Sequence, residues 1–149
     1  MRAVIQRVKC ASVKINNEIV GQIDNGLLIF LGVAEEDEDV DLDYIFDKTI
    51  GLRIFEDEEG KMNKSLSDVG GSILVVSQFT LQGDARRGRR PSFSGAARPE
   101  KAIPYYEEFI KRCKDLNINT QTGVFGADMQ VELCNDGPVT ILLDSTKLF

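Results

Sequence analysis

Two short segments of the chain combine residue types that are able to do chemistry. Residues 77–81 read SQFTL and follow an apolar stretch, so the hydroxyl groups of Ser77 and Thr80 and the amide of Gln78 emerge where a strand is expected to end. Strand ends are a common position for binding and catalytic side chains, because the strand is a rigid support. The same residue types also satisfy backbone groups at ordinary strand ends, and from these residues alone that simpler role is favoured.

The second segment, residues 135–140, reads NDGPVT at the start of an expected strand. Gly137 followed by Pro138 predicts a tight turn, since proline fixes its own φ and donates no backbone hydrogen bond. A peptide bond before proline is cis in about 5% of cases. The residues by themselves therefore predict a turn and nothing more specific.

The absence of histidine limits the chemistry of both segments. None of the 149 residues is His, which excludes a Ser-His-Asp or Cys-His arrangement, an HExxH zinc site and a histidine proton shuttle. Cys10, Cys113 and Cys134 are scattered and form no CxxC motif, so neither a disulfide framework nor a thiolate metal cluster is indicated. No apolar run approaches the roughly 20 residues of a membrane span, and a reducing cytoplasm is the expected location.

Charge is strongly segregated along the chain, although the net charge is only −6. Residues 35–59 contain 12 acidic and two basic side chains, which is typical of a solvated helix face. Residues 84–101 contain six basic and two acidic side chains. Their central run, RRGRRPSF, holds Arg86, Arg87, Arg89 and Arg90. Guanidinium groups bind phosphate through paired hydrogen bonds and Phe93 is able to stack on a base, but a solvated loop explains the composition equally well.

The length of the chain suits a single domain, residues 1–149. Hydrophobic periodicity and turn signals predict the positions of the strands that would carry these segments. Residues 1–9 and 12–15 favour β structure, and strands are predicted at residues 18–23, 26–33, 54–55, 72–80, 129–134 and 139–143. The run at 26–33 (GLLIFLGV) is apolar throughout, which predicts a strand covered on both faces. Residues 83–98 form a long polar loop, and a loop of this length inside a domain is usually functional or disordered.

Two amphipathic helices are predicted between the strands. The first has Leu42, Ile45, Phe46, Thr49 and Ile50 at helical spacing, an N-cap at Asp37 or Asp39, and its end near Gly51. The second has Tyr106, Phe109, Ile110 and Cys113 at helical spacing and begins at Pro99 or, since proline is tolerated only in a first turn, at Pro104. Six or seven strands with two helices indicate the α+β class, with a sheet that closes on itself and both helices on one side.

Taken together, the motifs resemble those of one known family. The segments MRAVIQRV, GLLIFLGV, LRIFEDEEGKMN, VVSQFTL, RRGRRPSF, FGADMQVEL and NDGPVT occur in the order and spacing of the D-aminoacyl-tRNA deacylase family. The similarity covers essentially the whole chain, and the combination of SQFTL with NDGPVT is specific to that family.

The resemblance implies a fold, an activity and an assembly. The fold would be a homodimeric, mostly antiparallel, β-barrel-like α+β domain with its two sites at the subunit interface. The activity would be hydrolysis of the ester that joins a D-amino acid, or glycine mischarged on tRNA(Ala), to the 3′-terminal adenosine of tRNA. Such an enzyme proofreads translation in the cytoplasm, binds tRNA and rejects L-aminoacyl-tRNA; no cofactor or metal is expected.

The resemblance also implies roles for individual residues. The site would be lined by Ser77, Gln78, Phe79 and Thr80, with Phe125 and Met129 at its border. Gly137 and Pro138 would form a cis dipeptide that enters the partner subunit's pocket and leaves no room for an L side chain, while Arg86, Arg87, Arg89 and Arg90 would contact tRNA. Gln82 departs from the family, whose members commonly carry Tyr at this position.

An activated ester needs an attacking water and a place for the oxyanion, which backbone N–H groups of Phe79 and Thr80 are able to supply. Thr80 as a nucleophile would need a neighbouring base, and SQFTL contains none. The sequence therefore favours assistance by the ribose 2′-hydroxyl of the substrate, with Thr80 orienting and Ser77 and Gln78 binding. Two alternatives stay open: a nucleic-acid-binding dimer without catalysis, and an esterase or peptidase that acts on free D-amino acid derivatives.

Overall fold

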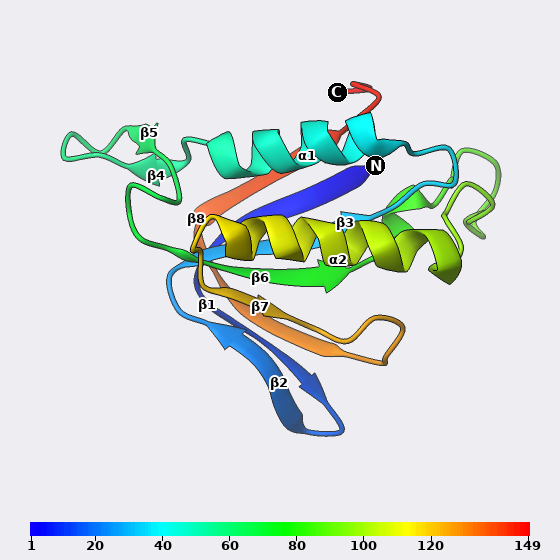
Figure 1. Ribbon diagram of the computed structural model, residues 1–149, viewed down its shortest axis with the longest axis horizontal. Helices are drawn as coiled ribbons and strands as arrows, with labels where there is room; N and C mark the ends of the chain where they lie inside the picture. The colour runs from blue at the N-terminus through cyan, green and yellow to red at the C-terminus, as the bar shows by residue number, and fades with distance from the viewer.

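One long strand, β1 (Arg2–Ile15), runs through the centre of the computed structural model, which describes residues 1–149 (Figure 1). The other strands are β2 (Glu18–Ile23), β3 (Gly26–Gly32), β4 (Phe55–Glu56), β5 (Met62–Lys64), β6 (Ser72–Ser77), β7 (Thr120–Thr122) and β8 (Gln130–Asp144). The helices are α1 (Asp39–Gly51) and α2 (Pro99–Asp115), and a short 3-10 helix, η1, spans Phe79–Gln82. No helix is long and apolar enough to cross a membrane.

The main sheet is mixed, so the prediction of a mostly antiparallel sheet is not confirmed. β1 pairs antiparallel with β8 along one side, while along the other side its first half pairs with β3 and its second half with β2. β3 pairs in parallel with β6, and β6 in parallel with β7. Parallel neighbours need a crossover connection, and α1 and α2 lie in the chain between these strands. β4 and β5 form a separate hairpin.

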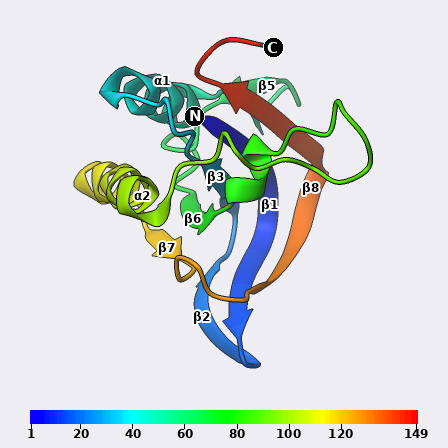
Figure 2. The same cartoon turned by 90° about the vertical axis from the view of Figure 1, so that its right-hand side faces the viewer.

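The sheet curls into a nearly closed barrel, as the sequence predicts. β2 and β7 are not hydrogen-bonded, but they come so close that a Cβ atom added at Gly21 would fall 2.5 Å from the carbonyl oxygen of Thr122. Only glycine permits this backbone approach. Both helices lie on the same side of the sheet, which agrees with the prediction (Figure 2).

Two hydrophobic clusters fill the spaces on either side of β3. Leu27, Ile29 and Leu31 belong to the larger cluster beneath the helices, whereas Leu28 belongs to a smaller cluster inside the barrel. The prediction that this strand is covered on both faces is therefore confirmed, and the uniformly apolar run follows from it.

The first helix has a different N-terminus from the one predicted. Glu38 is the N-cap residue, and its backbone N–H donates to Asp41 Oδ2 at 2.8 Å. Asp37 instead accepts a hydrogen bond from the Ala34 N–H and ion-pairs with the amino group of Met1. Neither Asp37 nor Asp39 is therefore the cap, while the predicted end near Gly51 is confirmed. α2 begins at Pro99, the earlier of the two predicted starts, and Pro104 lies inside it.

Several strand boundaries differ from the predictions because long-range pairing overrides local turn signals. The segments 1–9 and 12–15 are one strand, β1, and residues 129–143 belong largely to one strand, β8. Residues 135–138 do not reverse the chain: Asn135 pairs with Val8 and Thr140 with Gln6, so that residues 136–139 bulge out opposite Arg7. β6 ends at Ser77 rather than at Thr80, and β7 was not predicted.

Candidate active site

A cavity of about 270 Å³ opens where β6 ends, between α2 and the segment 125–131. Its lining is mostly apolar and consists of Leu31, Val33, Val76, Ser77, Gln78, Phe79, Ala102, Tyr106, Phe125, Gly126, Ala127, Asp128, Met129 and Val131. Small-molecule sites are typically concave and apolar with a few polar groups, with volumes from roughly 300 Å³. The cavity is therefore close to the lower end of this range.

The cavity brings together two sequence segments that lie about fifty positions apart. Ser77, Gln78 and Phe79 reach it from the end of β6, and Phe125 and Met129 reach it from the connection between β7 and β8. Thr80 is exposed at the start of η1 and does not line the cavity, but its Oγ1 accepts a hydrogen bond from Gln78 Nε2 at 2.5 Å. Six of the residues expected at the site are thus neighbours, and their roles in chemistry stay predictions.

The cavity wall carries one phenol, that of Tyr106, and one carboxylate, that of Asp128, and neither is a buried base. The Tyr106 hydroxyl donates to the Val75 carbonyl at 3.0 Å, and burial raises the pKa of Tyr106 to about 12, so the phenol stays neutral. Asp128 is the only carboxylate on the wall, and it is exposed. The sequence predicts neither residue at the site, although Asp128 lies within the FGADM motif that also contains Phe125 and Met129.

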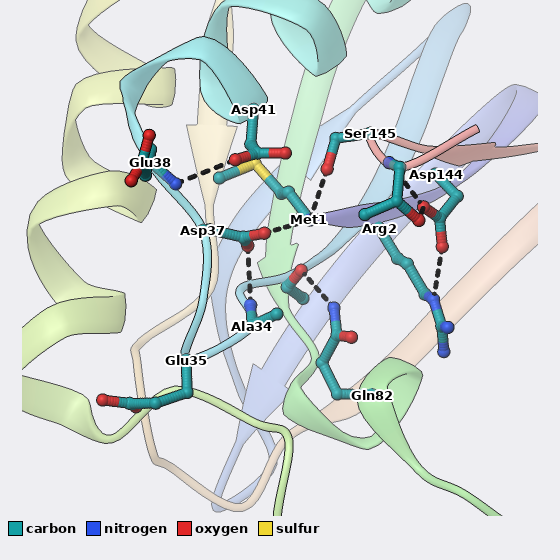
Figure 3. A network of polar contacts seen from close by, with 12 residues as sticks. Met1, Arg2, Ala34, Glu35, Asp37, Glu38, Asp41, Gln82, Asp144 and Ser145 are labelled. Atoms are coloured by element: carbon teal, nitrogen blue, oxygen red, sulfur yellow. Dashed lines mark hydrogen bonds and ion pairs between the residues drawn. The ribbon is translucent and has the colours of Figure 1, made fainter. Parts of the chain in front are cut away.

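Two side chains from outside the cavity hold η1 in place (Figure 3). Arg2 donates through Nη1 to the Leu81 carbonyl at 2.9 Å and through Nε to Asp144 Oδ2 at 2.7 Å. Gln82 Nε2 donates to the Gly32 carbonyl at 2.9 Å, which ties η1 to the end of β3. Gln82, the departure from the family pattern, therefore anchors the helix that carries Phe79 and Thr80 and does not line the cavity.

Gly137 and Pro138 lie in the bulge of β8, and neither lines the cavity of its own chain. Both are exposed, and the peptide bond between them is cis. Gly137 has a φ of 129°, and an added Cβ would fall 2.8 Å from Val139 Cγ2. The backbone at this position is one that only glycine adopts without strain.

Arg7 supports the bulge through hydrogen bonds of its side chain, a role that the sequence does not indicate. Its side chain is buried, and its guanidinium group donates through Nη1 to the Ile54 carbonyl at 2.7 Å and through Nε to the Asp136 carbonyl at 3.1 Å. The Asn135 amide donates to the Arg7 and Val139 carbonyls, at 3.0 Å each. These contacts fix both ends of the protruding segment.

The arginine-rich run lies in the exposed loop 83–98, which projects away from the sheet (Figure 2). Arg86 donates to Asp84 at 2.7 and 2.9 Å, and this guanidinium group holds the pKa of the carboxyl well below its usual range. Arg87, Arg89 and Arg90 form no ion pair. Phe93 packs edge-on against Phe79 with ring centroids 5.3 Å apart, so the loop adjoins the cavity wall.

The chain is a small α+β protein with an apolar cavity beside an arginine-rich loop. The family model described as D-Tyr-tRNA(Tyr) deacylase matches residues 4–144. The chain therefore belongs to this family, as the motifs predict, and is a hydrolase that acts on ester bonds.

Similar proteins agree with this placement. D-aminoacyl-tRNA deacylases from Clostridioides difficile (strain 630) and Thermosipho africanus (strain TCF52B) are 60% and 58% identical, each over the full length of both chains. A solved structure of a c-Myc DNA Unwinding Element Binding Protein superimposes with a TM-score of 0.91 at 41% identity, covering 97% of this chain and 98% of that one. A probable eukaryotic D-amino acid tRNA deacylase shares the fold, with a TM-score of 0.76 at 17% identity over 95% and 97% of the two chains.

Proposed function

We propose that the protein hydrolyses the ester between a D-amino acid and the 3′-terminal adenosine of tRNA, and so proofreads aminoacyl-tRNA in the cytoplasm. The observation that carries the proposal is the cavity itself, because it joins the SQFTL and FGADM motifs of the deacylase family at the end of β6. The arginine-rich loop that packs on Phe79 would hold the phosphates of the tRNA end.

The composition of the cavity supports catalysis assisted by the substrate. The phenol of Tyr106 is neutral and Asp128 is exposed, so no buried base is available to activate a water or Thr80. The N–H groups of Phe79 and Thr80 begin η1, where helical N–H groups have no partner within the helix. They would bind the oxyanion, and the 2′-hydroxyl of the terminal adenosine would position the attacking water.

Selectivity would come from a second copy of the chain. Gly137 and Pro138 are exposed and lie outside the cavity of their own chain, so they reach a cavity only in a homodimer. β8, which carries them, pairs only with β1 and exposes the apolar side chain of Leu142. In the dimer, the two carbonyl groups of the dipeptide would hold the α-amino group and exclude an L side chain.

This exclusion also predicts activity on glycyl-tRNA. Glycine has no side chain to exclude, so a site that rejects L residues by steric contact admits glycine as it admits a D residue. Glycine mischarged on tRNA(Ala) would therefore be a second substrate. The whole chain, residues 1–149, would act as a single domain without a cofactor or metal.

Replacing Thr80 with Ala is expected to lower single-turnover hydrolysis of D-tyrosyl-tRNA about 5-fold without abolishing it. The substitution removes one neutral hydrogen bond, worth about 1 kcal/mol, but keeps the backbone N–H that binds the oxyanion. Release of D-tyrosine is measured with enzyme in excess, alongside tRNA binding. Complete loss of hydrolysis with intact tRNA binding would show that Thr80 acts directly and that assistance by the substrate is insufficient.

Asp128→Asn is the matched control, because it tests whether the carboxylate of Asp128 acts as the catalytic base. It keeps the size of the side chain on the cavity wall and removes the only carboxylate there. If the 2′-hydroxyl assists the reaction, this variant keeps most of the hydrolysis rate at neutral pH. A rate lower by about 100-fold would assign the base to Asp128 instead.

Neutralising two loop arginines, Arg89→Gln with Arg90→Gln, is expected to weaken tRNA binding and flatten its salt dependence. Each lost phosphate contact lowers the slope of log K against log salt by about 0.7–0.9. The control pair Lys61→Gln with Lys64→Gln removes the same charge from the β4–β5 hairpin, at the opposite end of the molecule (Figure 1). An unchanged slope for the loop variant, or an equal change for the control, would contradict the assignment.

A nucleic-acid-binding protein without catalysis is the second candidate. The name of the structural relative at 41% identity refers to binding of a DNA unwinding element, and the arginine-rich loop suits such a role. Binding alone gives no reason for an apolar cavity beside the loop. An esterase acting on free D-amino acid derivatives would have the cavity but would not depend on the arginines.

A further inference from the structure

Cys10 and Cys134 are far apart in the sequence but face each other across two paired strands. Cys10 lies in β1 and Cys134 in β8, and the antiparallel register pairs the two residues directly. Both thiols are free and both residues are exposed, whereas Cys113 is buried. The fold thus brings two of the three thiols together at the surface.

Directly opposed positions of an antiparallel pair have the geometry that a disulfide needs. In a regular pair their Cα atoms lie about 4.5–5.5 Å apart, and their side chains leave the same face of the sheet. The register of β1 and β8 shifts between Val8 and Cys10, so Cys10 and Cys134 are the first pair of the ladder that continues to Lys14. A disulfide spans Cα separations of about 4.4–6.8 Å. A bond between Cys10 and Cys134 therefore needs side-chain rotation but no change in the pairing of β1 with β8.

The two cysteines share one hollow at the surface of the chain. This hollow of about 340 Å³ is also lined by the polar residues Gln22 and Glu132 and by the apolar residues Ile23 and Leu133. The next residue of β1, Ala11, is buried, so the opposite face of the strand belongs to the core. Small solutes in water are thus able to reach both sulfur atoms.

We propose that Cys10 and Cys134 form a reversible dithiol–disulfide site whose reaction partner is a low-molecular-weight disulfide. One cysteine thiolate attacks the small disulfide, forms a mixed disulfide and releases one small thiol. The other cysteine thiolate attacks the protein sulfur of that mixed disulfide and releases the second small thiol. The pair loses two electrons, the small disulfide gains them, and the two thiols formed take up the protons that the cysteines lose.

The site lies at the base of the bulge that carries Gly137 and Pro138. Cys134 directly precedes Asn135, whose amide holds the Arg7 and Val139 carbonyls at 3.0 Å. Oxidation would tie β8 covalently to β1 beside this segment. The inference rests on thiol geometry and exposure, so its test does not depend on the deacylase activity.

The test uses the full-length, reduced protein incubated with oxidised glutathione. The sample is denatured, alkylated, digested without reduction and analysed by mass spectrometry. We expect one alkylated cysteine per chain, Cys113, and a peptide pair joined through Cys10 and Cys134, with an intact mass about 2 Da below that of the reduced chain. Dithiothreitol is expected to restore alkylation of all three cysteines.

Single substitutions distinguish a disulfide between Cys10 and Cys134 from other products of oxidation. Cys10→Ser and Cys134→Ser each leave one partner and are expected to stop at the mixed disulfide with glutathione. Cys113→Ala is the matched control and is expected to keep the crosslink. Three alkylated cysteines after oxidation, a crosslink that includes Cys113, or a crosslink between two chains would overturn the proposal.

Discussion

A D-tyrosyl-tRNA that ends in 2′-deoxyadenosine is expected to be deacylated at least about 100-fold more slowly than the normal substrate. General acid–base assistance contributes about 10²- to 10⁴-fold to catalysis, and the proposed mechanism assigns that contribution to the 2′-hydroxyl. The cavity offers no substitute, because Tyr106 is neutral and Thr80 has no base beside it. Release of D-tyrosine is measured in single-turnover reactions with both substrates.

The comparison needs the spontaneous hydrolysis of each ester, since the 2′-hydroxyl also affects the uncatalysed rate. The quantity to compare is the acceleration by the protein over that background. Binding of the deoxy substrate, measured by competition, is expected to change little because only one hydroxyl group is lost. An acceleration that is the same for both substrates would show that the protein supplies its own base.

Filling the cavity with Ala127→Phe is expected to lower kcat/KM for D-tyrosyl-tRNA by about 100-fold or more. The phenyl ring would occupy a large part of a cavity of about 270 Å³ that the terminal nucleoside or amino acid has to enter. Misplacement of a substrate by about 1 Å is enough to cost about 100-fold in rate. Ala127 lies in the connection between β7 and β8, outside both core clusters, so the fold is expected to persist.

Val124→Phe is the matched control, because Val124 lies in the same connection, is 49% exposed and does not line the cavity. It is expected to keep nearly full activity. Circular dichroism and thermal unfolding of both variants separate a blocked cavity from a damaged fold. Full activity of a folded Ala127→Phe variant would place the reaction elsewhere in the molecule.

Local sequence patterns predicted most elements but not their pairing. The apolar run of β3 and the helical spacing in α1 and α2 are properties of neighbouring residues, and they were read correctly. The sequence could also have predicted the mixed sheet, since a strand, a helix and a second strand in succession favour a parallel pair of strands. β7 has only three residues, all polar, so it carries no periodic signal.

The bulge shows where turn signals fail. Asn135, Gly137 and Pro138 are turn-forming residues, and locally they predict a reversal of the chain. The long pairing of β8 with β1 on both sides of the bulge keeps the direction of the strand instead. Local propensity contributes little compared with a ladder of this length, so the segment projects outward without turning back.

The sequence motifs predict residues that line the cavity, but they do not predict the residues that support it. Ser77, Gln78, Phe79, Phe125 and Met129 surround one cavity, as the family resemblance implied. Arg7 and Tyr106 act through contacts with carbonyl groups far away in the sequence, so nothing near them in the chain marks their position. The pairing of Cys10 with Cys134 likewise depends on the register of two strands and not on a motif.

The most direct test is release of tyrosine from the same tRNA charged with D-tyrosine or with L-tyrosine. The proposed site predicts rapid release of D-tyrosine, with L-tyrosyl-tRNA hydrolysed no faster than in buffer. Release of neither would contradict the proposed activity and favour a nucleic-acid-binding protein. Release of both would contradict selection by Gly137 and Pro138 and would indicate a nonselective esterase.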